Sequence, residues 1–112
     1  MSKRSDRLLA EDILESIVKI KRYTKGMDRA AFENDEMRID AVVRNFEIIG
    51  EAANRISKEV QENNPKVEWR RIIGLRNRIV HEYFGIDIGI LWAIIQNNLD
   101  HLEEQITNID IK

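Results

Sequence analysis

Apolar residues recur along this chain at intervals of three and four, the spacing that puts them on one face of an α-helix. The first stripe runs through Leu9, Ile13, Ile17 and Ile20. It predicts a helix that opens with Ser5 or Asp6 as its N-cap and ends near Gly26. The polar connection at residues 28–33 is expected to hold an extra short helix or turn.

A longer stripe follows, with steps that alternate between three and four as in a coiled-coil seam. It comprises Ile39, Val42, Phe46, Ile49, Ala53, Ile56 and Val60. This pattern predicts one long helix, which begins near Asp35 and stops at Asn63, Asn64 and Pro65.

Two further helices complete the pattern. One is expected from Val67 to Tyr83 with Gly85 as its stop, and Asp87 is expected to cap the other. The stripe of this last helix is Leu91, Ile95, Leu99, Leu102, Ile106 and Ile109. No segment alternates with the period of a strand. The sequence therefore predicts an all-α, up-and-down bundle of four main helices in a single domain, residues 1–112.

The helix at residues 67–83 has a polar residue where a structural helix would have none. Its apolar arc consists of Trp69, Ile72, Ile73, Ile79, Val80, Tyr83 and Phe84. Arg76 falls in the middle of that arc, and a buried unpaired guanidinium is very costly. Arg76 therefore needs a carboxylate partner, a cleft or an anionic ligand.

Three more reactive side chains surround Arg76. Asn77 and His81 are four residues apart and share a helix face, while Arg76 and Tyr83 are seven apart on the arc itself. In a regular helix, the four side chains would converge on one groove where the apolar arc meets solvent. This groove is the candidate site.

Each of these residues also has a purely structural interpretation. Arg76 would form an ion pair with Glu47 or Glu51 of the preceding helix. The other three would be a surface amide, a boundary histidine and a core aromatic residue. The coincidence of all four within two helical turns favours a site.

Composition narrows the functional classes. The chain has 112 residues, 43% hydrophobic and 34% charged, as expected for a soluble helical protein. It has no cysteine, and His101 is the only other histidine, which argues against a structural zinc site; no cofactor is expected. The charged N-terminus lacks a signal-peptide core and the uncharged run at residues 88–95 is too short to span a bilayer, so a cytoplasmic location is expected.

Charge is distributed unevenly around a net value of −2. Residues 65–84 contain five Lys or Arg and two acidic residues, whereas residues 85–112 contain one Lys and five acidic residues. A local basic patch suits a phosphate backbone, and the acidic remainder would limit indiscriminate binding. A merely solvated charged face explains the same counts.

Arg76, Asn77, His81 and Tyr83 together match a known signature: Arg-Asn, three residues, His, one residue, Tyr. The flanking segments at residues 69–75, 84–87 and 45–53 match as well. On these residues the chain resembles the HepT-like branch of the HEPN superfamily, small helical proteins paired with minimal nucleotidyltransferases in prokaryotic toxin–antitoxin modules. The likeness covers nearly the whole chain.

The resemblance implies a metal-independent endoribonuclease that acts as a toxin, with its active site in a cleft of a homodimer. It assigns catalysis to Arg76 and His81, and substrate binding or orientation to Asn77, Arg78 and Tyr83. It also implies that the cognate nucleotidyltransferase antitoxin attaches AMP to Tyr83. Two alternatives stay open, a non-catalytic subunit that binds a nucleotide or docks a nucleotidyltransferase, and a pure dimerisation module.

Overall fold

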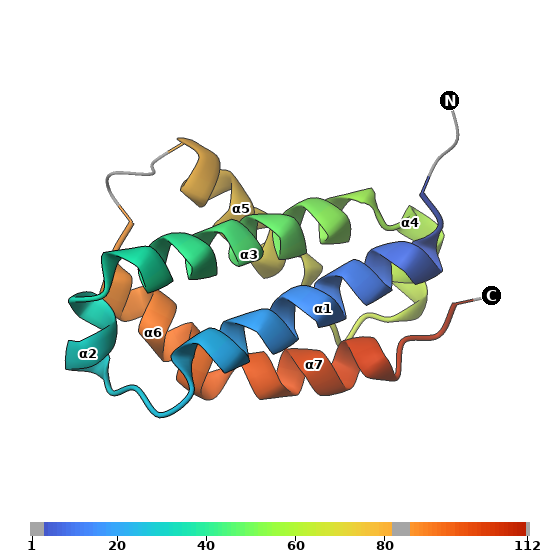
Figure 1. Ribbon diagram of the computed structural model, residues 1–112. Coiled ribbons are helices and arrows are strands. Elements are labelled where there is room, and N and C mark those ends of the chain that lie inside the picture. Colours follow the sequence, from blue (N-terminus) through green and yellow to red (C-terminus); the bar gives the residue numbers. More distant parts are fainter. Residues whose placement is uncertain (1–3, 82–85, 112) are drawn as a thin grey trace.

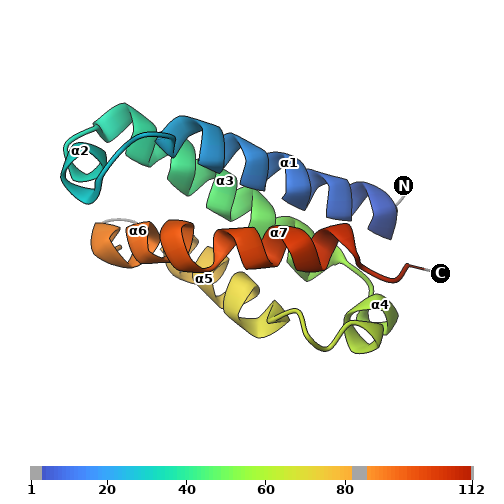
Figure 2. The same cartoon turned by 90° about the horizontal axis from the view of Figure 1, so that it is seen from below.

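The computed structural model describes residues 4–81 and 86–111, which contain seven helices and no strand (Figure 1). The helices are α1 (Asp6–Thr24), α2 (Arg29–Glu33), α3 (Glu36–Arg55), α4 (Lys58–Asn63), α5 (Trp69–His81), α6 (Ile88–Asn97) and α7 (Leu99–Thr107). Four rods form the bundle: α1, α3, α5 and the pair α6–α7. Helices α6 and α7 lie end to end along one side of the bundle (Figure 2). The predicted all-α bundle and the extra helix near residues 28–33 are confirmed.

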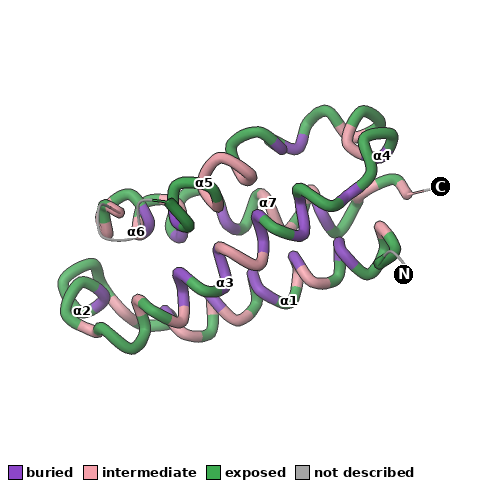
Figure 3. The backbone as a smooth tube through the Cα atoms, turned by 90° about the horizontal axis from the view of Figure 1, so that it is seen from above, coloured by how far each residue is buried: buried purple, intermediate pink, exposed green. Residues whose placement is uncertain are grey.

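The first helix forms where the stripe predicted it. The Ser5 hydroxyl accepts a hydrogen bond from the backbone N–H of Leu8 at 3.2 Å, so Ser5 is the N-cap. The helix ends at Thr24, and Gly26 turns the chain with a φ of +78°, a conformation that glycine adopts without steric cost. The facing sides of α1 and α3 carry most of the buried positions (Figure 3).

The prediction of one helix from Asp35 to Asn63 was wrong, because the chain breaks after Arg55. Ser57 begins α4, and its hydroxyl accepts from the backbone N–H of Val60 at 3.3 Å. The Asp6 carboxylate accepts from both the backbone N–H and the hydroxyl of Ser57, each at 2.8 Å. This contact ties the break to the first turn of α1.

The last helix is also interrupted. Asp87 caps α6 as predicted, since its carboxylate accepts from the backbone N–H of Gly89 at 2.8 Å. At Asn98 the backbone leaves helical geometry, although its N–H still donates to the Ile94 carbonyl at 2.9 Å. The two helices are therefore separated by one residue, and Leu91 and Leu99 on either side of it are both buried.

Helix α5 begins two residues later than predicted, and its expected end at Tyr83 and stop at Gly85 lie outside the described residues. Trp69 is buried at its start and donates its indole N–H to the Asn64 carbonyl at 3.1 Å. Ile79 is buried too, but Val80 is 44% exposed, so its assignment to the buried arc was wrong. Among the described residues, no helix has both the length and the apolar character needed to cross a membrane.

Candidate active site

Helices α3 and α5 cross at Gly50. A Cβ atom added to Gly50 would lie 2.0 Å from the Cβ of Arg76 and 3.1 Å from the carbonyl oxygen of Ile72. Both values are shorter than an ordinary van der Waals contact, and the second involves backbone that cannot rotate away. Gly50 is therefore the residue that lets α5 bring Arg76 against α3.

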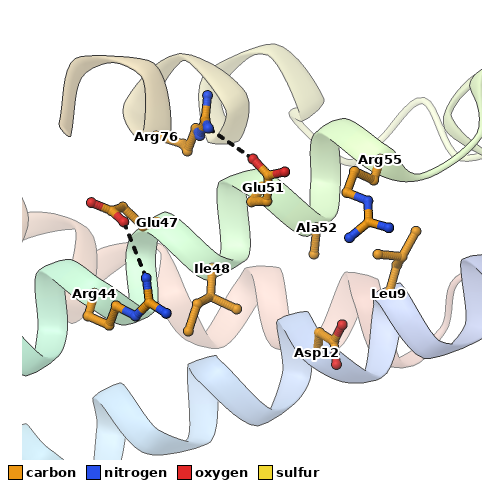
Figure 4. A pocket seen from close by; sticks show the side chains of 9 residues that line it. All are labelled: Leu9, Asp12, Arg44, Glu47, Ile48, Glu51, Ala52, Arg55 and Arg76. Atoms are coloured by element: carbon orange, nitrogen blue, oxygen red, sulfur yellow. Dashed lines mark ion pairs between the residues drawn. The ribbon is translucent and has the colours of Figure 1, made fainter. Parts of the chain in front are cut away.

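Beside this crossing lies a groove of about 370 Å³ between α1, α3 and α5. We call it the α3 groove. Its walls are formed by Leu9, Asp12, Arg44, Glu47, Ile48, Glu51, Ala52, Arg55 and Arg76 (Figure 4). Three guanidinium groups and three carboxylates thus surround a floor of aliphatic side chains.

Arg76 lies at the edge of the α3 groove with two polar partners. Its Nη2 is 3.0 Å from Oε2 of Glu51, and its Nη1 donates to Oδ1 of Asn77 at 3.1 Å. The ion pair expected under the structural interpretation is therefore present, with Glu51, while Glu47 instead lies 3.7 Å from Arg44. The side chain of Arg76 keeps 30% of its surface exposed, so these partners orient the guanidinium without sealing it from a ligand.

The remaining predicted residues are spread around α5. Asn77 and His81 are both exposed, and α5 stays helical through His81, as their common face requires. His81 is not among the residues that line the α3 groove. Arg78 lines a different, much smaller hollow of about 20 Å³ between α5 and α6, and Tyr83 lies outside the described residues. Within one protomer, the structure brings together Arg76 and Asn77 of the predicted set.

Sequence reasoning missed three residues of this region. Arg44 and Arg55 line the α3 groove, and Gly50 sets the approach of the two helices. The available signal was the spacing of Arg44, Glu47, Glu51 and Arg55, which repeats every three or four residues and marks a second, charged stripe on the long helix. Gly50 gave no such signal, because its role depends on the crossing. Among the described residues, no three His, Asp or Glu side chains group together as a metal ion would need.

Comparison with known proteins identifies the family. Residues 13–109 match a family described as HepT-like, ribonuclease HepT-like. A protein of Methanocaldococcus jannaschii named "Putative RNase MJ1380" is 40% identical over 95% of this chain and 97% of its own length. "Putative RNase TTE0752" of Caldanaerobacter subterraneus is 36% identical over 95% of each chain. "Probable ribonuclease HepT" of Thermococcus cleftensis is 34% identical over 90% of this chain and 92% of its own length. No solved structure matches the chain. These matches confirm the resemblance drawn from the signature at residues 76–83, and the chain belongs to the HepT-like ribonuclease family.

Proposed function

We propose that this protein is a metal-independent endoribonuclease of the HEPN type that cleaves RNA through attack by the RNA's own 2′-hydroxyl. The observation that carries the proposal is the state of Arg76. Its guanidinium is oriented by Glu51 and Asn77 and still partly exposed at the mouth of a groove. A guanidinium that is held in place with part of its surface open can still donate to a phosphate oxygen.

The reaction needs a base, an acid and a positive charge. A base removes the proton of the 2′-hydroxyl, whose oxygen then bonds to the adjacent phosphorus. The bond from phosphorus to the 5′-oxygen breaks, and an acid protonates the departing oxygen. The products are a 2′,3′-cyclic phosphate and a 5′-hydroxyl, so atoms and charges balance.

The two residues carried by the signature suit these roles. His81 is exposed, and a histidine exchanges a proton near neutral pH, a contribution worth typically ~10²–10⁴-fold in rate. Arg76 would donate to the phosphoryl oxygens as negative charge develops on them. In this proposal both are catalytic residues.

One protomer supplies one such histidine, whereas the reaction uses a base and an acid. A homodimer with α5 near its two-fold axis would supply the second. The exposed face of α5 supports this arrangement: Asn77, Val80 and His81 lie on it, and the space above Gly74 is empty to 4 Å. Helices approach closely over such a small residue, and Val80 would gain an apolar contact.

The remaining parts of the proposal are the roles that the HepT-like family implies for the other signature residues and for a partner protein. Asn77, Arg78 and Tyr83 would bind or orient the substrate RNA, with Asn77 acting through its hydrogen bond to Arg76. The protein would be the toxin of a toxin–antitoxin module with a minimal nucleotidyltransferase as antitoxin. AMP groups on Tyr83 would add anions beside the substrate's phosphates and repel them, which would neutralise the enzyme.

A second function remains in competition, a non-catalytic subunit that binds a nucleotide or docks a nucleotidyltransferase. The ion pair between Arg76 and Glu51 favours this second function, because the ion pair gives Arg76 a structural role that needs no catalysis. The two functions differ in whether RNA is broken.

The deciding experiment incubates the purified protein with total RNA in EDTA and examines the product ends. Arg76→Ala and His81→Ala are run beside it, with His101→Ala as the matched control, because His101 is exposed on α7 and far along the chain from the signature. Cleavage that survives EDTA, leaves cyclic phosphates and disappears only in the first two variants supports the ribonuclease. Intact RNA from a protein whose Tyr83 is unmodified by mass spectrometry favours the docking subunit. Intact RNA with AMP on Tyr83 calls for removal of the AMP and a repeat.

A further inference from the structure

The wall that α3 contributes to the α3 groove is a stripe of charged residues. Arg44, Glu47, Glu51 and Arg55 succeed one another at intervals of three or four residues. Arg55 is the last of them, and its side chain extends from α3 toward Leu9 and Asp12 of α1 (Figure 4). A guanidinium thus stands at the end of the groove away from Arg44.

The charges in this groove are almost all paired. Asp12 is held by Arg4, with Nε to Oδ2 at 2.7 Å and Nη2 to Oδ1 at 2.9 Å. The other two carboxylates have cations at 3.0 and 3.7 Å, from Arg76 and Arg44. Arg55 is the exception: within residues 4–81 and 86–111, no carboxylate lies within ion-pair distance of it. The groove therefore has one guanidinium group, that of Arg55, with no carboxylate at ion-pair distance among the described residues, and it stands at the end away from Arg44.

We propose that Arg55 binds a phosphate of the substrate RNA, one position along the strand from the phosphate that Arg76 contacts. This inference rests on the proposed ribonuclease function and extends its substrate site along α3. Arginine is suited to the task because its planar fork donates two parallel hydrogen bonds to a phosphate.

The geometry supports two phosphate positions in one groove. Arg55 lies four residues, about 6 Å of rise, beyond Glu51, the residue that pairs with Arg76. The two guanidinium groups thus flank a single carboxylate, which leaves an excess of positive charge at this part of the groove.

The floor of the groove completes the site. Leu9, Ile48 and Ala52 present aliphatic surface between the charged walls, on which the flat face of a base can rest. The volume of about 370 Å³ falls within the range of sites that hold small organic ligands. A nucleotide flanked by two phosphates matches both the apolar floor and the cationic rim.

Arg55 also has a structural task, because a cation in the last turn of α3 interacts favourably with the helix dipole. That task requires only a positive charge. Two parallel hydrogen bonds to a phosphate need the planar fork of arginine, which lysine lacks, so replacement by lysine should lower RNA affinity without affecting the interaction with the helix dipole.

The test measures the dissociation constant of a 2′-O-methylated RNA oligonucleotide, which cannot be cleaved by the 2′-hydroxyl route. Four proteins are compared: wild type, Arg55→Ala, Arg55→Lys and Lys25→Ala. Lys25 is exposed at the opposite end of α1 from Leu9, so its removal changes the net charge equally without touching the groove. Circular dichroism confirms that all four are folded, as expected for exposed positions.

We expect Arg55→Ala to weaken binding by about tenfold, the usual effect of one charge-assisted contact. The slope of log affinity against log salt should fall by about 0.7, the value for one phosphate of a single strand. Arg55→Lys should keep the slope and lose part of the affinity. Lys25→Ala should change binding less than about twofold. Equal affinities of Arg55→Ala and Lys25→Ala would overturn the inference.

Cleavage assays on the same proteins separate this inference from the proposed function. Arg55→Ala should raise KM by about tenfold and leave kcat unchanged, because the contact exists equally in the ground state and the transition state. If the wild type cleaves RNA and Arg55→Ala has the same KM, the inference about Arg55 is rejected and the ribonuclease proposal stands. A wild type that binds the oligonucleotide through Arg55 but cleaves no unmodified RNA rejects the enzyme and keeps the position. Absence of both binding and cleavage rejects both.

Discussion

Helices α1 and α5 both border the α3 groove, yet they are built differently. In α1 seven of 19 residues are buried, namely Leu9, Ala10, Ile13, Ser16, Ile17, Ile20 and Thr24. In α5 only Trp69 and Ile79 are buried among 13 residues, and Val80 is left exposed. The core of one chain covers the apolar face of α1, whereas most of α5 stays partly or fully exposed.

Their polar groups differ in the same way. On α1, Lys21 lies 2.5 Å from Asp100 and 3.0 Å from Glu103 of α7, and these partners, Asp100 first, raise the pKa of its ammonium group. That pairing joins two rods of the bundle. On α5, the partners of Arg76 leave the guanidinium partly exposed. The helix with fewer buried residues is therefore the one that carries the candidate site residues Arg76, Asn77 and His81. Substitutions on α1 and on α5 should show this difference.

The largest effect on stability is expected in α1. Ile17 is fully buried, so Ile17→Ala should lower the free energy of unfolding by about 2–5 kcal/mol through lost burial and the cavity left behind. Its neighbour Val18 is 51% exposed, and Val18→Ala should change stability by less than about 0.5 kcal/mol. Urea denaturation measures both. Similar losses in the two variants would contradict the description of α1 as a core helix.

The next effect is expected at the crossing of α3 and α5. Gly50→Ala adds a Cβ that α5 must move to accommodate, which should cost about 1–3 kcal/mol and reduce ribonuclease activity by displacing Arg76. Gly74→Ala is the matched control, because nothing lies within 4 Å of its new Cβ. Within a single protomer it should stabilise α5 by about 0.5–1 kcal/mol, and a partner helix packed over position 74 would reduce this gain. Thermal unfolding of the two variants tests the crossing, and a tolerated Gly50→Ala would count against it.

A smaller effect in free energy is expected from the partner of Arg76. Glu51→Gln keeps the size of the side chain but removes the charge that orients the guanidinium. Stability should stay within about 0.5 kcal/mol, since the ion pair lies at the surface with both side chains partly exposed, while kcat should fall by about tenfold through misplacement of Arg76. Glu47→Gln is the control, because Glu47 pairs with Arg44. Equal kcat values in the two variants would mean that Glu51 has no positioning role.

The smallest effect on the isolated fold is expected on the exposed face of α5. Val80 is 44% exposed, so Val80→Asp should change the unfolding free energy of a single protomer by about 0.5 kcal/mol or less. If α5 lies in a dimer interface, the same change buries a carboxylate and should shift the protein toward monomers. Sedimentation measured over a range of concentrations reports the shift. An unchanged mass would move the proposed interface away from α5.

The sequence predicted most helices correctly because each helix buries one apolar stripe. It did not predict the helix ends at which the apolar stripe continues into the next helix. Ile56 and Val60 keep their apolar spacing across the end of α3, so periodicity could not reveal the turn at Ser57. The turn is held instead by Asp6, a contact between residues 51 apart in the chain. Asn98 interrupts the last stripe in the same hidden way.

The candidate site was predicted as a set of residue types, and only part of its geometry followed. The need of Arg76 for a carboxylate could be inferred from its apolar surroundings, and Glu51 was one of the two candidates. The position of Arg78 could not be inferred from the sequence. A residue beside Ile79 faces α6 or solvent according to how α5 is rotated about its axis. Helix rotation depends on packing against neighbours, which a single stripe does not determine.

The close approach at Gly50 has a consequence for how this protein can change through mutation. The nearest atom that a larger residue at position 50 would strike is the Cβ of Arg76, which every amino acid except glycine possesses, and the backbone oxygen of Ile72 lies next nearest outside that side chain. A second substitution at position 76 could therefore relieve the clash only by glycine, and the guanidinium would be lost with it. No substitution at position 76 both compensates for a larger residue at position 50 and keeps the guanidinium, so tolerance of such a residue would depend on a shift of α5 relative to α3.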